Sequence, residues 1–394
     1  MSRLPWLLLL LLPPPTSTTA KDPRDTCPLL CDCDHDQKLV RCEGVQVISL
    51  PDRVPSTYET LLIRNTSIRS VAKNSFRKME RLVNVEFDHN PHLSTLEKLA
   101  FRGMKKIRLI KFASSPQLTE IERGAFTGIS NQFGLKILFE DTPIRRIHGG
   151  AFRNAHSIRE LSISGVDLAL SRHSFASIRQ LDFLTVSGVV LAEPELFSNS
   201  TRFHIVHIRH SEFDLPPRVF HDLSHVHHIL IERSRLASIA PDAFSGLTTI
   251  EVIELSGNNI GSISARAFTG VENLGQLKIT RNTIQELDTS ESVLSTAWQT
   301  RVEENTLNCT CDLKWMTALS ETSDVNFCGA SGAYRSVRSF ALATCAMPSR
   351  QKQSVAVPVI AVTSLSSSLF LSFSAALLSC FCFSSHGFCL ISQC

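Results

Sequence analysis

The chain has 394 residues, and its 40 Lys and Arg residues against 37 Asp and Glu residues give a net charge of only +3 at pH 7. The two signs are interspersed along the sequence, which lacks the clustered basic footprint of a DNA- or RNA-binding protein. We therefore expect no nucleic-acid partner.

Residues 1–20 have the pattern of a secretory signal peptide. Arg3 precedes an apolar run over residues 4–12, and the small residues Thr18 and Ala20 end the segment. A membrane anchor is the alternative, but the apolar run is too short to span a bilayer. The sequence thus predicts a cleaved signal and a mature chain that is extracellular or lumenal.

The twelve cysteines form three groups of four. These are Cys27, Cys31, Cys33 and Cys42; Cys309, Cys311, Cys328 and Cys345; and Cys380, Cys382, Cys389 and Cys394. In a secreted chain, an even set of cysteines gathered towards the ends favours disulfides. A zinc site is the alternative, because cysteines close in sequence also bind metal. Spacing alone does not choose the pairing.

A repeated pattern fills residues 58–307, between the first two cysteine groups. From Ile250 the chain reads I-E-V-I-E-L-S-G-N-N-I, and from Leu274 it reads L-G-Q-L-K-I-T-R-N-T-I, so aliphatic residues recur at offsets 0, 3, 5 and 10. About eleven repeats begin at Tyr58, Leu82, Ile107, Gly134, Ile158, Leu181, Phe203, Val226, Ile250, Leu274 and Ala297. A period this regular predicts a solenoid.

Each repeat combines a short strand with, in most repeats, a Phe behind it. The central L-x-L alternates at period two, as a strand does, and stacked repeats place these strands in one parallel sheet. We expect the recurrent rings to pack on one another in a buried column on the convex side. They are Phe76, Phe101, Phe126, Phe152, Phe175, Phe197, Phe220, Phe244 and Phe268.

With this period, the chain resembles the extracellular leucine-rich repeat family, in its class of roughly 24 residues per repeat. The resemblance implies an α/β-type repeat solenoid: a leucine-rich repeat horseshoe with a parallel concave β-sheet and disulfide-capped ends. The family usually carries Asn at offset 8, but here only Asn90, Asn258, Asn282 and Asn305 do so, with Thr, Ser or Val common elsewhere. We therefore expect a less regular ladder of amide hydrogen bonds in the first two thirds. Repeats two and three, D-H-N-P-H-L and A-S-S-P-Q-L, resemble those of glycoprotein-hormone receptors.

The first two cysteine groups also resemble parts of that family. C-P-L-L-C-D-C followed by V-R-C resembles its amino-terminal cap, over residues 21–57, and N-C-T-C-D-L-K-W resembles its carboxy-terminal cap, over residues 308–346. By that resemblance, the disulfides would join Cys27 with Cys33, Cys31 with Cys42, Cys309 with Cys328, and Cys311 with Cys345.

Three sequons for N-glycosylation occur, at Asn65, Asn199 and Asn308. We expect Asn65 at the edge of the first repeat, Asn199 on the convex side and Asn308 in the end cap. Because a glycan is bulky and solvated, these positions leave the middle of the concave sheet free for a partner.

After a linker over residues 347–354, residues 355–394 form a hydrophobic segment without any Lys, Arg, Asp or Glu. A single-pass helix usually has basic residues just inside the membrane, so their absence favours a removable signal for a glycolipid (GPI) anchor. Candidate attachment residues are Ser349, Ser354, Ser366, Ser367 and Ser368. The alternative is a transmembrane helix, in which the last four cysteines become candidates for acylation.

The concave face offers a candidate protein-binding surface. Offsets 2, 4 and 6 of each strand point outward, and four neighbours at offset 2 are apolar or aromatic, with Leu230 at offset 4 beside them. The four are Phe183, Ile205, His228 and Val252. An exposed apolar patch of this kind usually marks a partner surface; coverage by loops or by a curled cap is the alternative.

Charged residues flank this patch. Arg209 lies beside Glu232 at offset 6, and Glu254 lies beside Lys278 at offset 4. Such cross-strand pairs stabilise a sheet by about 0.2 to 1 kcal/mol each, and as rim residues they would tune partner choice.

Seven histidines occur between residues 204 and 228: His204, His207, His210, His221, His225, His227 and His228. No carboxylate accompanies them by an obvious spacing. A metal site, a pH-sensitive interface and ordinary solvated histidines stay open.

Motifs for catalysis are absent: the chain has no G-x-S-x-G, H-E-x-x-H or Gly-rich phosphate loop. We therefore expect no enzyme, cofactor or bound metal. The preferred function is a cell-surface adhesion molecule or co-receptor that recognises a protein partner through its concave face, and a homo-oligomer stays open. The alternatives are a receptor for a soluble ligand or microbial product that signals through an associated partner, and a structural matrix component.

Overall fold

The computed structural model describes residues 26–155, 157–287, 297–318, 320–329 and 335–345. The chain divides into two compact units, Met1–Ala346 and Met347–Cys394, and every described residue belongs to the first. The expected signal peptide, linker and hydrophobic anchor, with its four cysteines, lie outside the described residues. Among the helices that are described, none is long and apolar enough to cross a bilayer.

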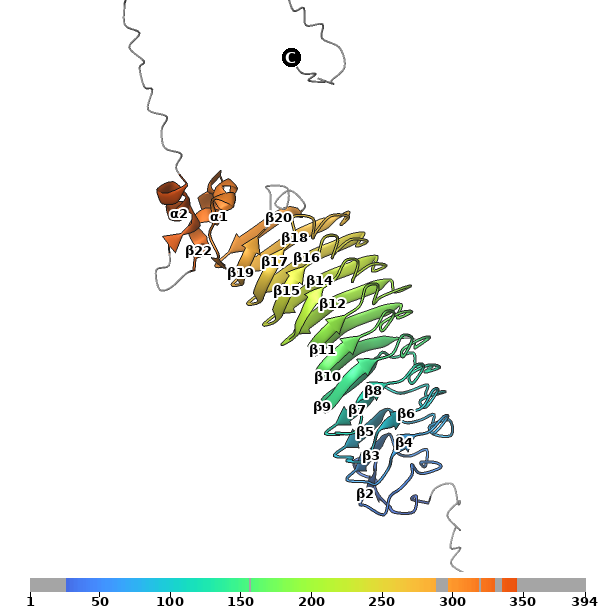
Figure 1. Ribbon diagram of the computed structural model, residues 1–394. Coiled ribbons are helices and arrows are strands. Elements are labelled where there is room, and N and C mark those ends of the chain that lie inside the picture. Colours follow the sequence, from blue (N-terminus) through green and yellow to red (C-terminus); the bar gives the residue numbers. More distant parts are fainter. Residues whose placement is uncertain (1–25, 156, 288–296, 319, 330–334, 346–394) are drawn as a thin grey trace, which may run out of the picture. The chain divides into compact units, whose positions relative to one another are not determined.

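The first unit is a solenoid in which every repeat adds one strand to a long parallel sheet (Figure 1). The strands are, in sheet order, β2 (Leu39–Glu43), β3 (Thr60–Arg64), β5 (Asn84–Asp88), β7 (Leu109–Ala113), β9 (Leu135–Ile147), β10 (Ile158–Leu170), β11 (Gln180–Ala192), β12 (Arg202–Arg209), β14 (His225–Glu232), β16 (Thr249–Ser256), β18 (Leu274–Thr280) and β20 (Ala297–Glu303). At the amino end, β1 (Cys31–Asp34) pairs antiparallel with β2. The strands from β3 to β20 are those of the predicted repeats, and β2 adds one turn from the cap.

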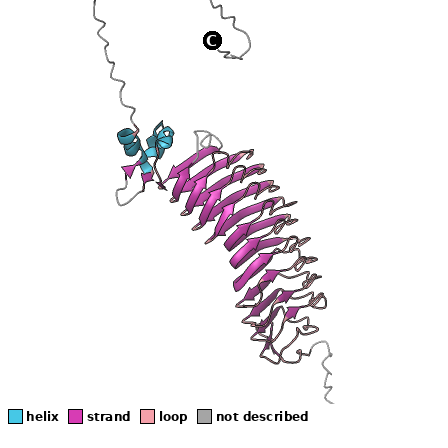
Figure 2. Ribbon diagram, viewed as in Figure 1, coloured by secondary structure: helices cyan, strands magenta, loops and turns pink. Residues whose placement is uncertain are grey.

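A second set of short strands follows the first in the turns where the first strand is short. It comprises β4 (Ser70–Val71), β6 (Thr95–Leu96), β8 (Glu120–Ile121), β13 (Glu212–Leu215), β15 (Arg235–Ile239), β17 (Asn259–Ile263), β19 (Thr283–Leu287), β21 (Thr306–Leu307), β22 (Phe327–Cys328) and β23 (Arg335–Ser336). The described helices all lie in the carboxy-terminal cap (Figure 2) and are η3 (Cys311–Ala318), α1 (Ser320–Val325) and α2 (Val337–Thr344). Turns and short strands, not α-helices, therefore form the convex side of the repeats.

The core follows from the period-two alternation of the strands. Offsets 3 and 5, such as Leu61 and Ile63 in β3 or Ile253 and Leu255 in β16, are fully buried. Behind them lies the predicted Phe column, whose neighbouring ring centroids are 5.0 to 5.9 Å apart in stacked geometry. All nine rings of the column lie within the described residues. The column has one break, between Phe152 and Phe175, and every other pair of neighbouring rings is stacked.

The amino-terminal repeats contain a second aromatic stack that the period did not predict. Phe87, Phe112 and Phe139 occupy offset 5 of three successive strands, with ring centroids 4.9 and 5.0 Å apart. Phe112 also meets Phe101 of the main column edge-on at 6.3 Å. Both inward layers of these repeats are therefore aromatic, which adds stacking to the burial of area.

The ladder at offset 8 is regular in the carboxy-terminal repeats, as predicted. The backbone N–H groups of Ser234, Asn258, Asn282 and Asn305 each donate to Oδ1 of the next rung, at 2.8 to 3.0 Å. The last acceptor is Asn326, a cap residue that the repeat pattern did not reveal. Each of these buried amides also donates to a strand carbonyl, as Asn282 does to Leu255 at 2.9 Å. The ladder thus continues into the cap.

Earlier in the chain, Asn90 alone is an amide rung: it accepts from the backbone N–H of Thr66 at 3.1 Å and donates to Ile63 O at 2.9 Å. In the repeats between Asn90 and Ser234, shorter side chains serve as rungs or no rung exists. Ser115 donates its backbone N–H to Thr142 Oγ1 at a long 3.4 Å, and Val166 and Val189 offer no acceptor. Around these positions β9, β10 and β11 run for 13 residues each, because backbone pairing continues through the turn. Gly188 permits this approach, since a Cβ there would lie 2.1 Å from the carbonyl oxygen of Gly165.

Four disulfides cover the two ends of the solenoid. They join Cys27 with Cys33, Cys31 with Cys42, Cys309 with Cys328, and Cys311 with Cys345. This is the pairing implied by the family resemblance. It places the folded domain in an oxidising compartment, outside the cell or at its surface.

Candidate protein-binding surface

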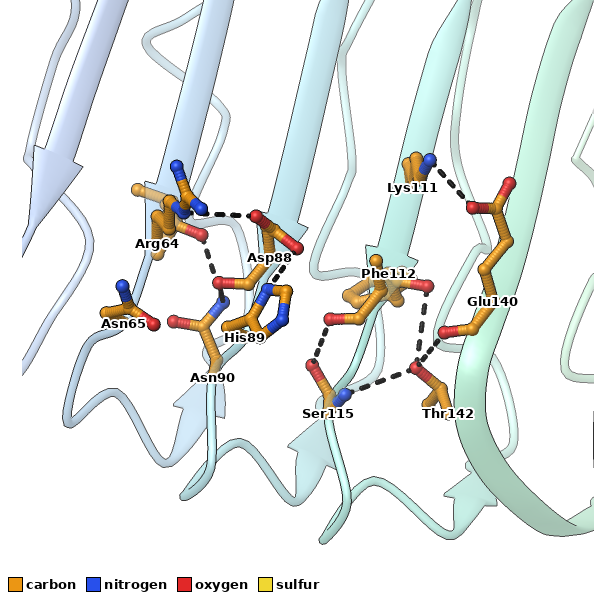
Figure 3. A network of polar contacts seen from close by, with 12 residues as sticks. Arg64, Asn65, Asp88, His89, Asn90, Lys111, Phe112, Ser115, Glu140 and Thr142 are labelled. Atoms are coloured by element: carbon orange, nitrogen blue, oxygen red, sulfur yellow. Dashed lines mark hydrogen bonds and ion pairs between the residues drawn. The ribbon is translucent and has the colours of Figure 1, made fainter.

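The amino-terminal part of the concave face neutralises its own charges. Ion pairs join neighbouring strands between Arg64 and Asp88 at 3.2 Å and between Lys111 and Glu140 at 2.7 Å (Figure 3). Lys136 pairs with Glu160 at 2.6 Å on the next strands. The hydrogen bond to Glu140 raises the pKa of the Lys111 ammonium above its usual value. Few charges are left here for a partner to satisfy.

The next three strands differ from this region, and we call their outward residues the central band. The central band comprises Phe183, Ile205, His207, Arg209, His228, Leu230 and Glu232 on β11, β12 and β14. Phe183, Ile205 and His228 are register partners, as the offsets predicted. Phe183 is 41% exposed, and Ile205 and Leu230 are partly exposed. An apolar strip thus faces solvent in the middle of the sheet.

Val252 does not belong to this strip, contrary to expectation. It is only 9% exposed, although it occupies the same outward column. Its short β-branched side chain lies between the longer His228 and Gln276 on the neighbouring strands, so the strip ends at β14.

The predicted pairing of Arg209 with Glu232 is wrong as an ion pair. The two residues are register partners, but Glu232 Oε1 lies 3.1 Å from His207 Nε2. Nε of Arg209 is buried and has no hydrogen-bond partner among the described residues. No described residue forms a hydrogen bond or ion pair with the rest of the guanidinium, and the residue as a whole is partly exposed.

The predicted pairing of Glu254 with Lys278 is loose, at 4.0 Å. Glu254 also lies 3.3 Å from His228 Nε2, although that nitrogen forms no hydrogen bond within the described residues. Burial lowers the pKa of His228, and nearby Lys278 lowers it further against the opposing effect of Glu254. Burial likewise lowers the pKa of His207, partly offset by its hydrogen bond to Glu232. Both histidines are thus held in the neutral form near pH 7.

A groove borders the central band along the starts of strands β10 to β20, with a volume of about 900 Å³. We call it the rim groove. Phe183 meets His204 edge-on at 6.2 Å, and His204 stacks on His227 with ring centroids 4.5 Å apart. His227 in turn pairs with Glu251. These side chains form a continuous row, each touching the one on the next strand.

The row is interrupted at Gly275, one strand beyond Glu251. A Cβ at this position would lie 2.6 Å from the Glu251 carbonyl oxygen, so the close approach of the strands requires glycine. Trp298, on the far side of the gap, is 91% exposed and lines the same groove. An indole this exposed is unusual, and tryptophan is a residue that often anchors protein interfaces.

Two family models of repeats match the chain in sequence. Residues 56–182 match the model described as a BspA-type leucine-rich repeat region of six copies, and residues 213–260 and 224–284 match the model described as leucine-rich repeat. The chain belongs to the leucine-rich repeat family. No curated protein matches it in sequence.

The chain is also similar, at low identity, to chains of several solved structures. The chain is 16% identical to human 5T4 (Wnt-activated inhibitory factor 1, trophoblast glycoprotein), over 79% of this chain and 95% of that chain, with a TM-score of 0.40. It is 19% identical to a chain of the octameric complex of latrophilin 3, Unc5D and FLRT2, over 79% and 96%, with a TM-score of 0.46. In the TLR13–ssRNA13 complex, the match is 18% identical over 59% of this chain, with a TM-score of 0.45, and spans 33% of that chain.

The histidine cluster of this leucine-rich repeat protein has carboxylate partners that sequence spacing concealed. Glu232, Glu251 and Glu254 each lie one repeat beyond the histidine that they contact, so no local motif joins them. These histidines and carboxylates do not form a group of converging metal ligands. Within the described residues, such a group occurs elsewhere, at Glu120, Glu122 and His148. There His148 Nε2 lies 2.8 Å from Glu120 Oε2, so the two satisfy each other.

The three sequon asparagines, Asn65, Asn199 and Asn308, are all exposed in the structure. None of them lies in the central band. Their modification remains a prediction.

Proposed function

We propose that this leucine-rich repeat protein is displayed at the outer cell surface and binds another protein through the central band and the adjoining rim groove. One observation carries the proposal. The concave charges of β3 to β10 are paired with one another, whereas the next three strands expose apolar side chains beside an unpartnered guanidinium. An apolar centre with polar residues around it is the usual anatomy of a protein interface.

The chemistry of the central band indicates what the partner presents. Phe183 and Ile205 offer apolar area, and Arg209, on the same strand as Ile205, lacks an acceptor. A carboxylate is the natural counterpart, because Arg binds it through two parallel hydrogen bonds. We therefore expect a partner surface with an acidic side chain next to an apolar or aromatic one.

The predicted attachment through a glycolipid forms part of this proposal. Release of the displayed protein by a phosphatidylinositol-specific phospholipase would support it. Retention after that treatment, together with detection of a carboxy-terminal tag, would instead favour a transmembrane helix.

A cell-mixing assay tests the binding function. Cells displaying the full-length protein in one colour are mixed with cells that lack it in another, and a labelled dimeric form of residues 21–346 is offered to a panel of cell types. If displaying cells clump only with one another, the protein is a homophilic adhesion molecule. If only the labelled form binds other cells, it is a receptor or co-receptor for a different protein.

Variants locate the binding surface. Ile205→Glu and Phe183→Ser should each weaken binding at least 30-fold, the effect of losing an interface hot spot, while secretion stays normal. Leu109→Glu is a matched control, since Leu109 occupies the same outward column three strands before the central band. Equal loss in all three variants would mean a structural effect. Unchanged binding by Phe183→Ser and Ile205→Glu would place the surface elsewhere.

A further inference from the structure

Six exposed cations stand on the turns of the amino-terminal repeats. These turns lie behind the long sheet (Figure 1). Three of these cations precede a phenylalanine of the buried column by three residues. The other three directly follow a phenylalanine of that column. They are Lys73, Lys98 and Arg123 in the first row and Arg77, Arg102 and Arg153 in the second. In later repeats the same positions hold Arg172, Pro194, Pro217, Pro241 and Ala265 in the first row, and Ala176, Ser198, His221, Ser245 and Thr269 in the second. Arg172, unlike the six cations, is paired with Glu195. The two rows are therefore a regional feature and do not belong to the repeat template.

Backbone hydrogen bonds hold these turns in one layer. The N–H of Asn74 donates to Leu99 O at 3.1 Å, that of Leu99 to Gly124 O at 3.0 Å, and that of Gly124 to Gly150 O at 3.1 Å. Neighbouring turns bonded in this way are about 5 Å apart, as strands are. Cations in the first row consequently follow one another at about that step.

Glycines make room for the cationic side chains. A Cβ on Gly124 would lie 3.1 Å from Cγ of Lys98, and one on Gly128 would lie 3.3 Å from Cγ of Arg102. These side chains thus lie along the surface across the following repeat.

The two rows meet at Gly150. A Cβ there would lie 3.9 Å from both Arg123 Nε and Arg153 Cβ. A hollow of about 450 Å³ opens at this point, and Arg123, Arg153, Gly150 and the sequon residue Asn199 are among the residues that line it. Two guanidinium groups therefore border a space that glycine leaves empty.

Carboxylates do not neutralise the six cations, since the structure shows an ion pair for none of them within the described residues. Two acidic residues lie nearby in sequence. Glu97 accepts a hydrogen bond from the backbone N–H of Lys73 at 2.9 Å, and Glu122 lies with Glu120 and His148. The surface therefore keeps an excess of positive charge.

We propose that this convex surface binds a sulfated polysaccharide chain of the glycosaminoglycan class. A first row of long, exposed cations at a regular step, with further arginines in the second row beside it, suits a linear polyanion better than a single compact anion. The four disulfides place the domain in an oxidising compartment, where sulfated polysaccharides are the abundant linear polyanions. The convex site is separate from the central band, so it adds a second ligand to the protein partner.

Heparin affinity of the purified full-length protein tests the proposal. The triple variant Lys98→Ser, Arg102→Ser and Arg123→Ser should bind roughly 30- to 100-fold more weakly at 0.15 M salt, and the slope of log K against log salt should fall by about 2 to 3. The matched control is the triple variant Arg145→Ser, Arg235→Ser and Arg266→Ser. It removes the same charge, but from residues paired with Asp167, Glu212 and Asp242 at 3.0 to 3.2 Å. It should retain the wild-type affinity.

Three results would overturn the inference. The first is failure of the wild-type protein to bind heparin at 0.15 M salt, and the second is equal weakening in the two triple variants, which would reveal only a response to net charge. The third is displacement of heparin by single-stranded RNA at lower concentration than by heparan sulfate, which would assign the surface to nucleic acid. Near-equal thermal unfolding temperatures of the two triple variants exclude misfolding. Because Phe183→Ser leaves the convex side intact, its heparin affinity should not change, and this separates the inference from the concave binding function.

Discussion

The amino-terminal and carboxy-terminal repeats distribute their charges in opposite ways. In the first repeats, concave charges pair across strands, as Lys111 does with Glu140, while convex cations such as Arg102 have no described ion-pair partner. In the later repeats, convex cations are paired, as Arg266 is with Asp242 at 3.2 Å, while the central band keeps apolar side chains exposed. One repeated backbone thus presents two surfaces of different chemistry.

The inner layers differ as well. The amino-terminal repeats stack Phe87, Phe112 and Phe139 beside the main column, whereas the carboxy-terminal repeats bond successive turns through Asn258, Asn282 and neighbouring amides. Aromatic stacking is thus doubled in the first region, whereas the second combines the single Phe column with a run of buried amides. Substitutions can separate the two contributions.

The largest effect is expected in the aromatic region. Phe112→Ala should lower the free energy of unfolding by about 3 to 5 kcal/mol, because the ring is fully buried and touches Phe87, Phe139 and Phe101. Phe268→Ala, at the end of the main column, removes a ring that stacks only on Phe244 in the described part of the chain and should cost less. Denaturant unfolding measures both variants. Equal losses would contradict the special contribution of the double stack.

The next largest effect is expected in the amide ladder. Asn282→Ala should cost about 3 kcal/mol, because it leaves the buried carbonyl of Leu255 and N–H of Asn258 without partners. Ser115→Ala, at the equivalent rung of an amino-terminal repeat, should cost about 1 kcal/mol or less, because the side chain that it removes donates only one long hydrogen bond within the described residues, from Oγ to Ala113 O at 3.4 Å. Denaturation midpoints compare the two. A Ser115→Ala loss as large as that of Asn282→Ala would show that both regions depend equally on the ladder.

A smaller effect tests the charge pairing of the concave face. A double-mutant cycle on Lys111→Ala and Glu140→Ala should give a coupling energy of about 0.2 to 1 kcal/mol that falls with added salt. The same cycle on Glu254 and Lys278, whose charged atoms are 4.0 Å apart, should give less. A larger coupling energy for Glu254 and Lys278 than for Lys111 and Glu140 would contradict the distinction between the paired charges of the amino-terminal concave face and the loosely paired charges beside the central band.

The smallest effect is a dependence on pH confined to the central band. Because the folded pKa values of His207 and His228 lie below the ordinary value of about 6.5, their stabilising contribution is complete above that pH and is lost as the pH falls through the folded pKa values. The charged and titratable neighbours of His207 are Glu232, Arg209 and His210. Those of His228 are Glu254, Lys278 and His227. The double variant His207→Gln and His228→Gln should therefore lose less thermal stability than the wild type between pH 7.4 and pH 5.5. An identical loss in both proteins would remove these histidines as the cause.

Much of the fold was predictable because one template repeats. The offsets 0, 3, 5 and 10 placed the strands, the buried aliphatic residues and the outward columns, and the cysteine groups marked the two ends. The departures occur where neighbouring repeats meet. Val252 is buried by longer side chains beside it, Glu232 contacts His207 instead of Arg209, and Asn326 extends the ladder from outside the repeats.

The sequence by itself determined the solenoid, its period, its boundaries and which face of each strand enters the core, because these depend on residues close together in the chain. Only the tertiary structure decided which outward residues pair across repeats, where the rim groove opens, and that the convex cations form two unpaired rows. Those properties depend on side chains about 24 residues apart in the chain, which the stacking of repeats brings within a few ångströms of one another. The repeat period does not specify the rotamers of these side chains or the neighbours that they contact. The repeat pattern therefore determines the position of each surface residue. The neighbours of that residue on adjacent turns determine whether its side chain is already paired or can bind a partner.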